Sequence, residues 1–407
     1  MHEVIDRGFW HIEYPDNLVT GLWTGHLSCD FEQMSSDYYR AGHCILASVL
    51  RNGRSNNECD FVFPVAAYLL RHAIELAFKA VICAKKNNSQ ICDCFQRDKH
   101  DIRSLFDRSK NDLESCLDVF EIEWLNGFAS SSNVWDSSSD FFRYPLSSKN
   151  SLNGEFIDVF EVSKTLTAAY ETVLRACELG DSGVSIYDAK SSYLSIACGG
   201  IGNCLLHAPL ESSGLYFVSG GFSRAAELLC NDTVLSWREK CFPLLFLLRH
   251  SIELGLKHLT CPRNIIGARG KQGHALGKLW EVPRARLKLQ ASKSGWDLAP
   301  LDIVNDQLAE LNRLDKGGFL FRYPVNKSME YQIPPDSKID VKSIYEYQKG
   351  IIDFLDGCNY VVDEIEDYDL ETPEGATGDF KHLVAAFEPI GPVSPPLSYT
   401  TPPHTEN

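Results

Sequence analysis

The stretch LLRHAIELAFK (residues 69–79) occurs a second time, almost unchanged, as LLRHSIELGLK (residues 247–257). In a helix, residues four apart lie on one row. Each copy therefore carries a charged row, which is Arg71, Glu75 and Lys79 in the first and Arg249, Glu253 and Lys257 in the second. Apolar rows flank the charged row on both sides, whereas a solvated helix face has polar neighbours. The sequence predicts two central helices whose charges form a buried structural network.

Two further blocks follow this helix in the same order in both copies. KHDIRSLFDR (residues 99–108) and GHALGKLWEV (residues 273–282) each contain a histidine, His100 or His274, followed at the same spacing by leucine and an aromatic residue. DSSSDFFRYP (residues 136–145) and DKGGFLFRYP (residues 315–324) both keep an aspartate, Asp136 or Asp315, seven residues before an arginine. Three matching blocks in one order indicate a duplicated unit.

The rest of the chain has mainly helical periodicity. Amphipathic patterns predict further helices over residues 37–52, 109–125, 156–179, 219–232, 299–314 and 340–368. We expect an all-α protein of two tandem helical-bundle units related by a pseudo-two-fold axis, with few or no strands. The expected parts are an N-terminal extension (1–36), unit 1 (37–187), a linker (188–214), unit 2 (215–370), and an acidic, Pro-rich tail (371–407) that is disordered.

Composition fits a globular protein of two or three domains, since 44% of the 407 residues are hydrophobic and 23% are charged. The 14 cysteines are scattered without a repeated CxxC spacing, which predicts buried thiols and neither a metal site nor a cofactor. No run of about 20 uncharged apolar residues is present, and the N-terminal residues do not resemble a secretory signal. We therefore expect a cytoplasmic protein that does not contact a membrane; the oligomeric state is not predicted.

Charge is distributed unevenly along the chain. The net charge is −16, which disfavours a protein that wraps nucleic acid over its whole surface. Residues 233–300, however, hold twelve Lys/Arg and four acids, whereas residues 361–407 hold ten acids and one Lys. This asymmetry predicts one positive face over residues 238–293 that binds RNA or a partner protein, with the acidic C-terminal region screening it.

The repeated RHxIELxxK helix, the histidine that follows it and the later arginine resemble the HEPN superfamily, over about residues 37–180 and 215–368. The resemblance implies helical bundles that dimerise. Many members are metal-independent ribonucleases of antiviral or toxin systems, and others are non-catalytic nucleotide- or protein-binding modules. The family's nuclease motif is an arginine, four to six intervening residues and then a histidine, near the dimer seam. Only Arg269 and His274 have this spacing; Arg97 and His100 are too close together.

Metal-free RNA cleavage needs a base, an acid and a cation, which imidazole and guanidinium groups supply. The candidate catalytic residues are His100, Arg143, His274, Arg322 and Arg269. In the structural alternative, the histidines bond to the preceding loops, and the arginines pair with Asp136, Asp315, Glu75 or Glu253.

Tyr144 and Tyr323 are candidates for stacking on a base, with packing against the bundle as the alternative. Two functions follow from these candidates. One is a HEPN-like RNA-binding protein or metal-independent endoribonuclease of a bacterial defence or toxin-like system. The other is a non-catalytic helical adaptor that binds a protein or a nucleotide.

Overall fold

The computed structural model describes residues 7–51, 58–86, 88–144, 155–176, 186–206, 214–260 and 273–371. Over these residues the fold is all-α, with strands of only two residues. The helices are α1 (Leu27–Arg51), α2 (Phe63–Lys85), α3 (Asn88–Asp98), α4 (Ile102–Leu113), α5 (Val119–Asp136), α6 (Val159–Arg175), α7 (Gly214–Asn231), α8 (Trp237–Thr260), α9 (Leu276–Ser294), α10 (Ala299–Leu314) and α11 (Val341–Glu371). In two antiparallel pairs, β1 (Leu18–Val19) joins β4 (Ile339–Asp340), and β2 (Phe156–Ile157) joins β3 (Ile196–Ala197).

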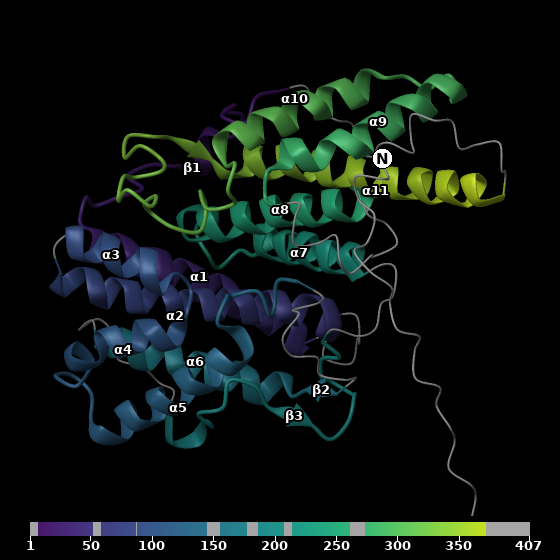
Figure 1. Cartoon of the computed structure of the whole chain (residues 1–407). Coiled ribbons are helices and arrows are strands. Elements are labelled where there is room, and N and C mark those ends of the chain that lie inside the picture. Colours follow the sequence, from purple (N-terminus) through teal and green to yellow (C-terminus); the bar gives the residue numbers. More distant parts are fainter. Residues whose placement is uncertain are drawn as a thin grey trace, which may run out of the picture.

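The helices form two stacked halves (Figure 1). Helices α1–α6 make the first half and α7–α11 the second, and α1 and α2 face α7 and α8 across the middle. The repeated stretches form the central helices α2 and α8. Every residue from 63 to 83 in α2 and from 240 to 260 in α8 is buried. The charged rows of these helices therefore lie inside the protein.

Helix α2, with the short helical turn Glu58–Val62 before it, is the one segment of the described residues that is long and apolar enough to cross a membrane. Its most apolar window is 94% buried inside the structure. A core helix passes the same test of length and composition, because both environments select apolar residues. The absence of membrane contact stays a prediction.

The helices expected over residues 109–125 and 37–52 differ most from the structure. The single helix expected over residues 109–125 is broken, because α4 ends at Leu113 and α5 begins at Val119. Asp118 caps α5 by accepting from the backbone N–H of Glu121, whose side chain accepts from the N–H of Asp118. This reciprocal cap starts a new helix in the middle of a continuous apolar pattern.

The second difference is the start of the helix expected over residues 37–52, because α1 already begins at Leu27. The residues before α1 pack on the second half of the chain, where β1 pairs with β4. The Trp23 indole donates to the carbonyl of Ile333 at 2.8 Å, and the Phe9 ring meets Tyr347 edge-on. This segment therefore links the two halves. The tail expected after residue 370 lies outside the described residues, apart from the last residue of α11.

The two copies of the FRYP block lie after α5 and after α10, and each contacts the opposite half. Tyr144, from the first copy, donates to Glu253 of α8. Tyr323, from the second copy, donates to Glu75 of α2. Such a reciprocal exchange is what a pseudo-two-fold axis would produce, and the axis itself stays a prediction that superposing residues 60–145 on 238–324 would test.

Candidate functional site

The charged row of α2 forms a buried network around one carboxylate. Glu75 is fully buried and accepts from Arg71 at 2.5 Å and from Lys79 at 2.7 Å. Arg71 also pairs with Asp136 at 3.0 Å and donates to the backbone carbonyl of His100. The Nδ1 atom of His100 lies 3.1 Å from the Glu75 carboxylate. These partners offset the cost of burying the charges, and they fix the position of His100.

Helix α8 repeats this network with its own residues. Glu253 accepts from Arg249 at 3.1 Å and from Lys257 at 2.7 Å, and it lies 2.8 Å from Nδ1 of His274. Arg249 lies 3.6 Å from Asp315 and donates to the carbonyl of His274 at 2.8 Å. Each half thus holds one histidine by its backbone and by one ring nitrogen, so the other ring nitrogen stays available.

Each network receives a tyrosine from the opposite half. The Tyr323 hydroxyl donates to Glu75 at 2.7 Å and lies 2.8 Å from Nδ1 of His100. The Tyr144 hydroxyl donates to Glu253 at 3.2 Å. Tyr323 is only 8% exposed and Tyr144 is half-buried. A ring that stacks on a base needs an open face, so the base-stacking role of these tyrosines stays a prediction, and in the structure their hydroxyls support the two networks.

The Glu75 network favours a neutral imidazole at His100. Burial acts to raise the pKa of Glu75, but Lys79 and His100 outweigh it and hold this pKa well below its usual range. Burial also lowers the pKa of His100 to about 4, so its ring is neutral near pH 7. Because Nδ1 donates to the ionised Glu75, Nε2 keeps its lone pair. His100 therefore has the protonation state and orientation of a base.

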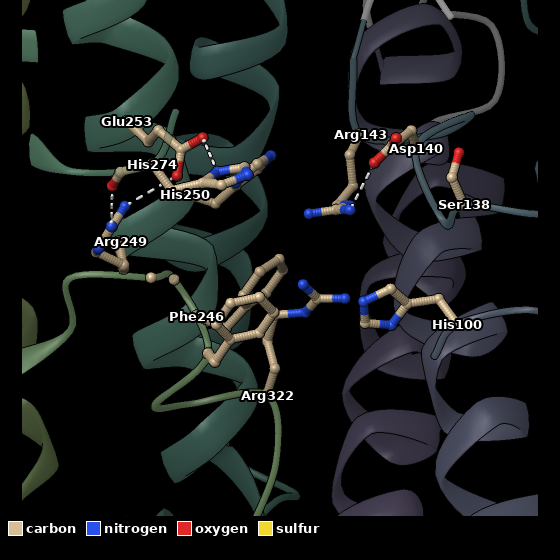
Figure 2. Close-up of a pocket in the computed structure, with 13 residues that line it drawn as sticks. His100, Ser138, Asp140, Arg143, Phe246, Arg249, His250, Glu253, His274 and Arg322 are labelled. Carbon is tan, nitrogen blue, oxygen red and sulfur yellow. Dashed lines mark hydrogen bonds and ion pairs between the residues drawn. The ribbon is translucent and has the colours of Figure 1, made fainter. Parts of the chain in front are cut away.

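A cavity of about 210 Å³ lies between the two halves, where the two networks meet (Figure 2). Its lining consists of His100, Ser138, Asp140 and Arg143 from the first half and Phe246, Arg249, His250, Glu253, His274, Gly317, Gly318, Phe319 and Arg322 from the second. In Figure 2 the guanidinium groups of Arg143 and Arg322 point into the same space, with the His100 ring beside Arg322. We refer to this cavity as the central pocket.

Four of the five residues predicted to be catalytic line the central pocket, namely His100, Arg143, His274 and Arg322. The fifth, Arg269, lies outside the described residues. The convergence of these side chains is a fact of the structure, whereas their catalytic role stays a prediction.

The two arginines of the central pocket differ in their partners. Arg143 forms an ion pair with Asp140 at 2.7 Å. Arg322 is only 3% exposed and forms no ion pair with a carboxylate of the described residues. Its Nη2 atom reaches the Tyr323 hydroxyl at 3.3 Å, and its Nε atom has no described partner. Phe319 occupies the position that matches Asp140. A guanidinium keeps its charge when buried, so Arg322 is suited to an anionic ligand.

The ion pairs that the structural alternative expected for these two arginines are not found among the described residues. Asp136 and Glu75 pair with Arg71, and the matching carboxylates of the second half pair with Arg249. The carboxylates named by that alternative are thus already engaged with the central helices, which leaves Arg322 without one.

Both pocket arginines lie against the same aromatic ring. The Cζ atom of Arg143 is 5.4 Å from the centre of the Tyr68 ring, and that of Arg322 is 6.0 Å from it. The ring attracts each cation, but two guanidinium groups against one ring also repel each other. An anion bound by both would relieve this repulsion, which again favours an anionic ligand.

The basic stretch over residues 238–293 does not form one positive face, contrary to the prediction. Lys240, Arg249 and Lys257 are buried, and Arg238 pairs with Asp37 of α1 at 3.0 Å. The sequence count could not separate charges inside the core from charges on the surface. Residues 263, 269 and 271 lie outside the described residues. The remaining basic residues all belong to α9, and they are Lys278, Arg284, Arg286, Lys288 and Lys293.

Sequence reasoning missed Asp140, Phe319 and Tyr68 as determinants of the pocket. A signal was present in the mismatches between the two copies rather than in their identities. Aligning the repeats places Asp140 opposite Phe319 and Tyr68 opposite Phe246. Such differences mark where the two sequence repeats are not alike.

Among the described residues, no group of three or more His, Cys, Asp or Glu side chains is arranged to hold a metal ion. Comparisons of the chain with protein-family models, curated proteins and solved structures found no match. The geometry of the central pocket is therefore the basis for a functional assignment.

Proposed function

We propose that this protein binds RNA in the central pocket and cleaves it as a metal-independent endoribonuclease. The observation that carries the proposal is the buried guanidinium of Arg322, which has no carboxylate partner among the described residues and lies beside the neutral imidazole of His100. A phosphodiester supplies the charge-assisted partner that the guanidinium lacks. The cavity of about 210 Å³ suits a phosphate group with its neighbouring sugar oxygens, since pockets for whole drug-sized molecules measure about 300–1,000 Å³.

The pocket residues divide the chemistry in a definite order. Nε2 of His100 takes the proton of a ribose 2′-hydroxyl, and the 2′-oxygen attacks the adjacent phosphorus. The bond from phosphorus to the 5′-oxygen breaks, and His274 gives a proton to that oxygen. The products are a 2′,3′-cyclic phosphate and a 5′-hydroxyl. Arg322 and Arg143 stabilise the negative charge that grows on the two non-bridging oxygens.

The assignment of base and acid follows from the surroundings of the two rings. The His100 side chain is 24% exposed and its buried ring is neutral, as a base must be. The His274 side chain is 45% exposed, so its ring is accessible to a leaving 5′-oxygen. Each ring is held at Nδ1 by a glutamate, so both present Nε2 for proton transfer.

This function agrees with a HEPN-like protein of a bacterial defence or toxin-like system, which is part of the same proposal. In that superfamily an arginine and a histidine act together near a dimer seam. Here His100 and Arg143 come from the first half and His274 and Arg322 from the second, and all four line one pocket. A tandem duplication would place within a single chain what a dimer assembles from two.

The alternative is a non-catalytic adaptor that binds a nucleotide phosphate in the same pocket. The small volume of the cavity favours it, because a strand must bend sharply or unstack to bring one phosphate between the halves. The same arginines would bind the ligand, but neither histidine would be needed for turnover. Binding without cleavage separates this alternative from the ribonuclease.

The test is to incubate the full-length protein with end-labelled single-stranded RNA in excess EDTA and to identify the new termini. We expect cleavage that leaves cyclic phosphates. His100→Gln and His274→Gln are each expected to reduce the rate by about 100-fold or more, the usual contribution of one acid–base group. His11→Gln, on the exposed N-terminal segment, is the matched control and should cleave at the wild-type rate.

The outcomes separate the two functions. RNA binding that needs Arg322, without cleavage by the wild type, would support the adaptor. Cleavage that survives both pocket substitutions would contradict the proposed site. Circular dichroism of each variant shows whether a lost activity reflects a lost fold.

A further inference from the structure

We infer that the groove between α9 and α10 binds a second stretch of the same RNA strand, an inference that rests on the proposed function. This groove has a volume of about 440 Å³ and lies outside the central pocket. It is lined by Gly277, Trp280, Glu281, Arg284, Ala285, Lys288, Asn305, Leu308 and Ala309. Its walls thus combine two cations with apolar side chains, and Trp280, only 3% exposed, offers an N–H donor rather than a stacking face.

Two hydrogen-bond donors on residues that line this groove have no partner in the described part of the chain. Trp280 is 3% exposed, and its indole Nε1 has no hydrogen-bond partner among the described residues. The Nε atom of Arg284 is also buried without such a partner. Indole and guanidinium nitrogens can only donate, and buried donors are rarely left unsatisfied in native proteins. A ligand with acceptor oxygens, such as a phosphate, would satisfy donors of this kind.

The charge of α9 also favours a polyanion. The helix carries five basic residues and one acid, Glu281, although the whole chain has a net charge of −16. Glu281 lines the groove and would oppose an anion, but Arg284 and Lys288 lie one and two turns further along the same wall. The positive end of the groove is therefore the part expected to contact phosphates.

The position of α9 connects the groove to the central pocket. His274 lines the pocket, and α9 begins at Leu276, so Gly277 of the groove lies within three residues of a proposed catalytic side chain. From Gly277 to Lys288 the helix advances about 17 Å, at 1.5 Å per residue. A strand cleaved in the pocket can therefore continue along this wall for several nucleotides, which favours RNA over an acidic peptide.

The inference is tested by measuring the affinity of the full-length protein for a fluorescent single-stranded RNA of about 12 nucleotides and for a dinucleotide. Lys288→Glu changes a lysine of the groove, and Lys293→Glu changes another exposed lysine of α9 that does not line it. We expect Lys288→Glu to weaken binding of the longer RNA by about tenfold and to lower its salt slope by about 1. Lys293→Glu should change that affinity less than about threefold.

Trp280→Phe keeps an aromatic ring and removes only the N–H donor, so it should weaken the binding of the longer RNA without unfolding the helix. The dinucleotide should bind all of these variants as it binds the wild type, because it occupies only the central pocket. Equal losses for Lys288→Glu and Lys293→Glu would overturn the inference. So would polyglutamate that competes for the groove as well as RNA does.

The groove and the proposed activity can fail separately. If the longer RNA binds through Lys288 and Trp280 but is never cleaved, the groove stands and the ribonuclease fails. If cleavage depends on His100 but neither groove substitution changes the affinity for longer RNA, the ribonuclease stands and the groove fails.

Discussion

The two FRYP turns have a similar backbone conformation at one matching position but differ in charge. Ser139 has a φ of 63°, and Gly318, at the matching position, has a φ of 73°, so both turns pass through the left-handed region. The next position holds Asp140 in the first turn and Phe319 in the second. Asp140 neutralises Arg143, whereas Arg322 has no such partner among the described residues. The difference teaches that a shared scaffold can be kept while a single side chain decides which half can take an anion.

The charged rows of α2 and α8 show the opposite behaviour, since the contacts of their two glutamates match. Each glutamate accepts from an arginine, a lysine, a histidine Nδ1 and a tyrosine of the other half. Buried networks tolerate little change, because one lost partner leaves an uncompensated charge. The turns lie at the pocket wall, where a ligand can replace a lost partner, and they are free to diverge.

The largest expected effect comes from removing the centre of either network. Glu75→Leu and Glu253→Leu should each reduce the free energy of unfolding by about 3–5 kcal/mol, because a buried arginine and lysine lose their shared partner. Chemical denaturation measures both. Glu123→Leu, on the exposed face of α5, is the control and should stay within about 0.5 kcal/mol of wild type. Equal stabilities for all three variants would show that the rows contribute no net stability.

The second effect separates the two pocket arginines. Arg322→Gln should slow RNA cleavage by about 100- to 1,000-fold, as expected when a donor to the transition-state charge is removed. It should not lower stability, because the buried cation that it removes has no carboxylate partner in the described part of the chain. Arg143→Gln should slow cleavage less than Arg322→Gln does, because the charge of Arg143 is already paired with Asp140. Cleavage rates and denaturation curves of both variants test this, and a larger loss for Arg143→Gln would reverse the assignment.

The third effect exchanges the residues that distinguish the turns. Phe319→Asp would give Arg322 an internal carboxylate that competes with a phosphate, and RNA affinity should fall by about tenfold, or 1.4 kcal/mol. Asp140→Phe should act in the opposite direction by freeing Arg143. Titrations of labelled RNA against both variants measure the two shifts. Changes of the same sign would mean that packing at these positions matters more than charge.

The sequence predicted the parts of the fold that depend on local pattern. The predicted helix over residues 299–314 has the bounds of α10, because its apolar spacing and Pro300 define it locally. The break between α4 and α5 was missed, since it depends on the side-chain cap of Asp118 within an unbroken apolar pattern. Periodicity reports which face of a helix is buried, but a cap acts through hydrogen bonds that periodicity does not contain.

The candidate site was predictable in its residue types but not in its pairing. His100 and Arg322 stand out because each has a counterpart in the repeat, and both do line the central pocket. The exchange of Tyr144 and Tyr323 between halves depends on how the halves pack, which no local pattern encodes. For the same reason, counting charges over residues 238–293 could not reveal that Lys240 and Lys257 are buried in the core.

The smallest effect concerns pH and distinguishes His100 as a buried base. Burial lowers the pKa of His100 to about 4, below the usual value near 6.5 that the unfolded chain has. As pH falls below about 6.5 the unfolded state takes up a proton that the folded state does not, so the stability contributed above that pH is lost progressively until about pH 4. The titration of this one group should lower the free energy of unfolding by about 1 kcal/mol per pH unit in the window.

Urea denaturation at several pH values should show a shallower loss of stability for His100→Gln than for wild type. His72, whose pKa burial lowers to about 3, remains in the variant and preserves part of the slope. Identical slopes would mean that His100 becomes protonated as easily in the folded protein as in the unfolded chain, and that it is not the buried neutral base on which the proposed cleavage depends.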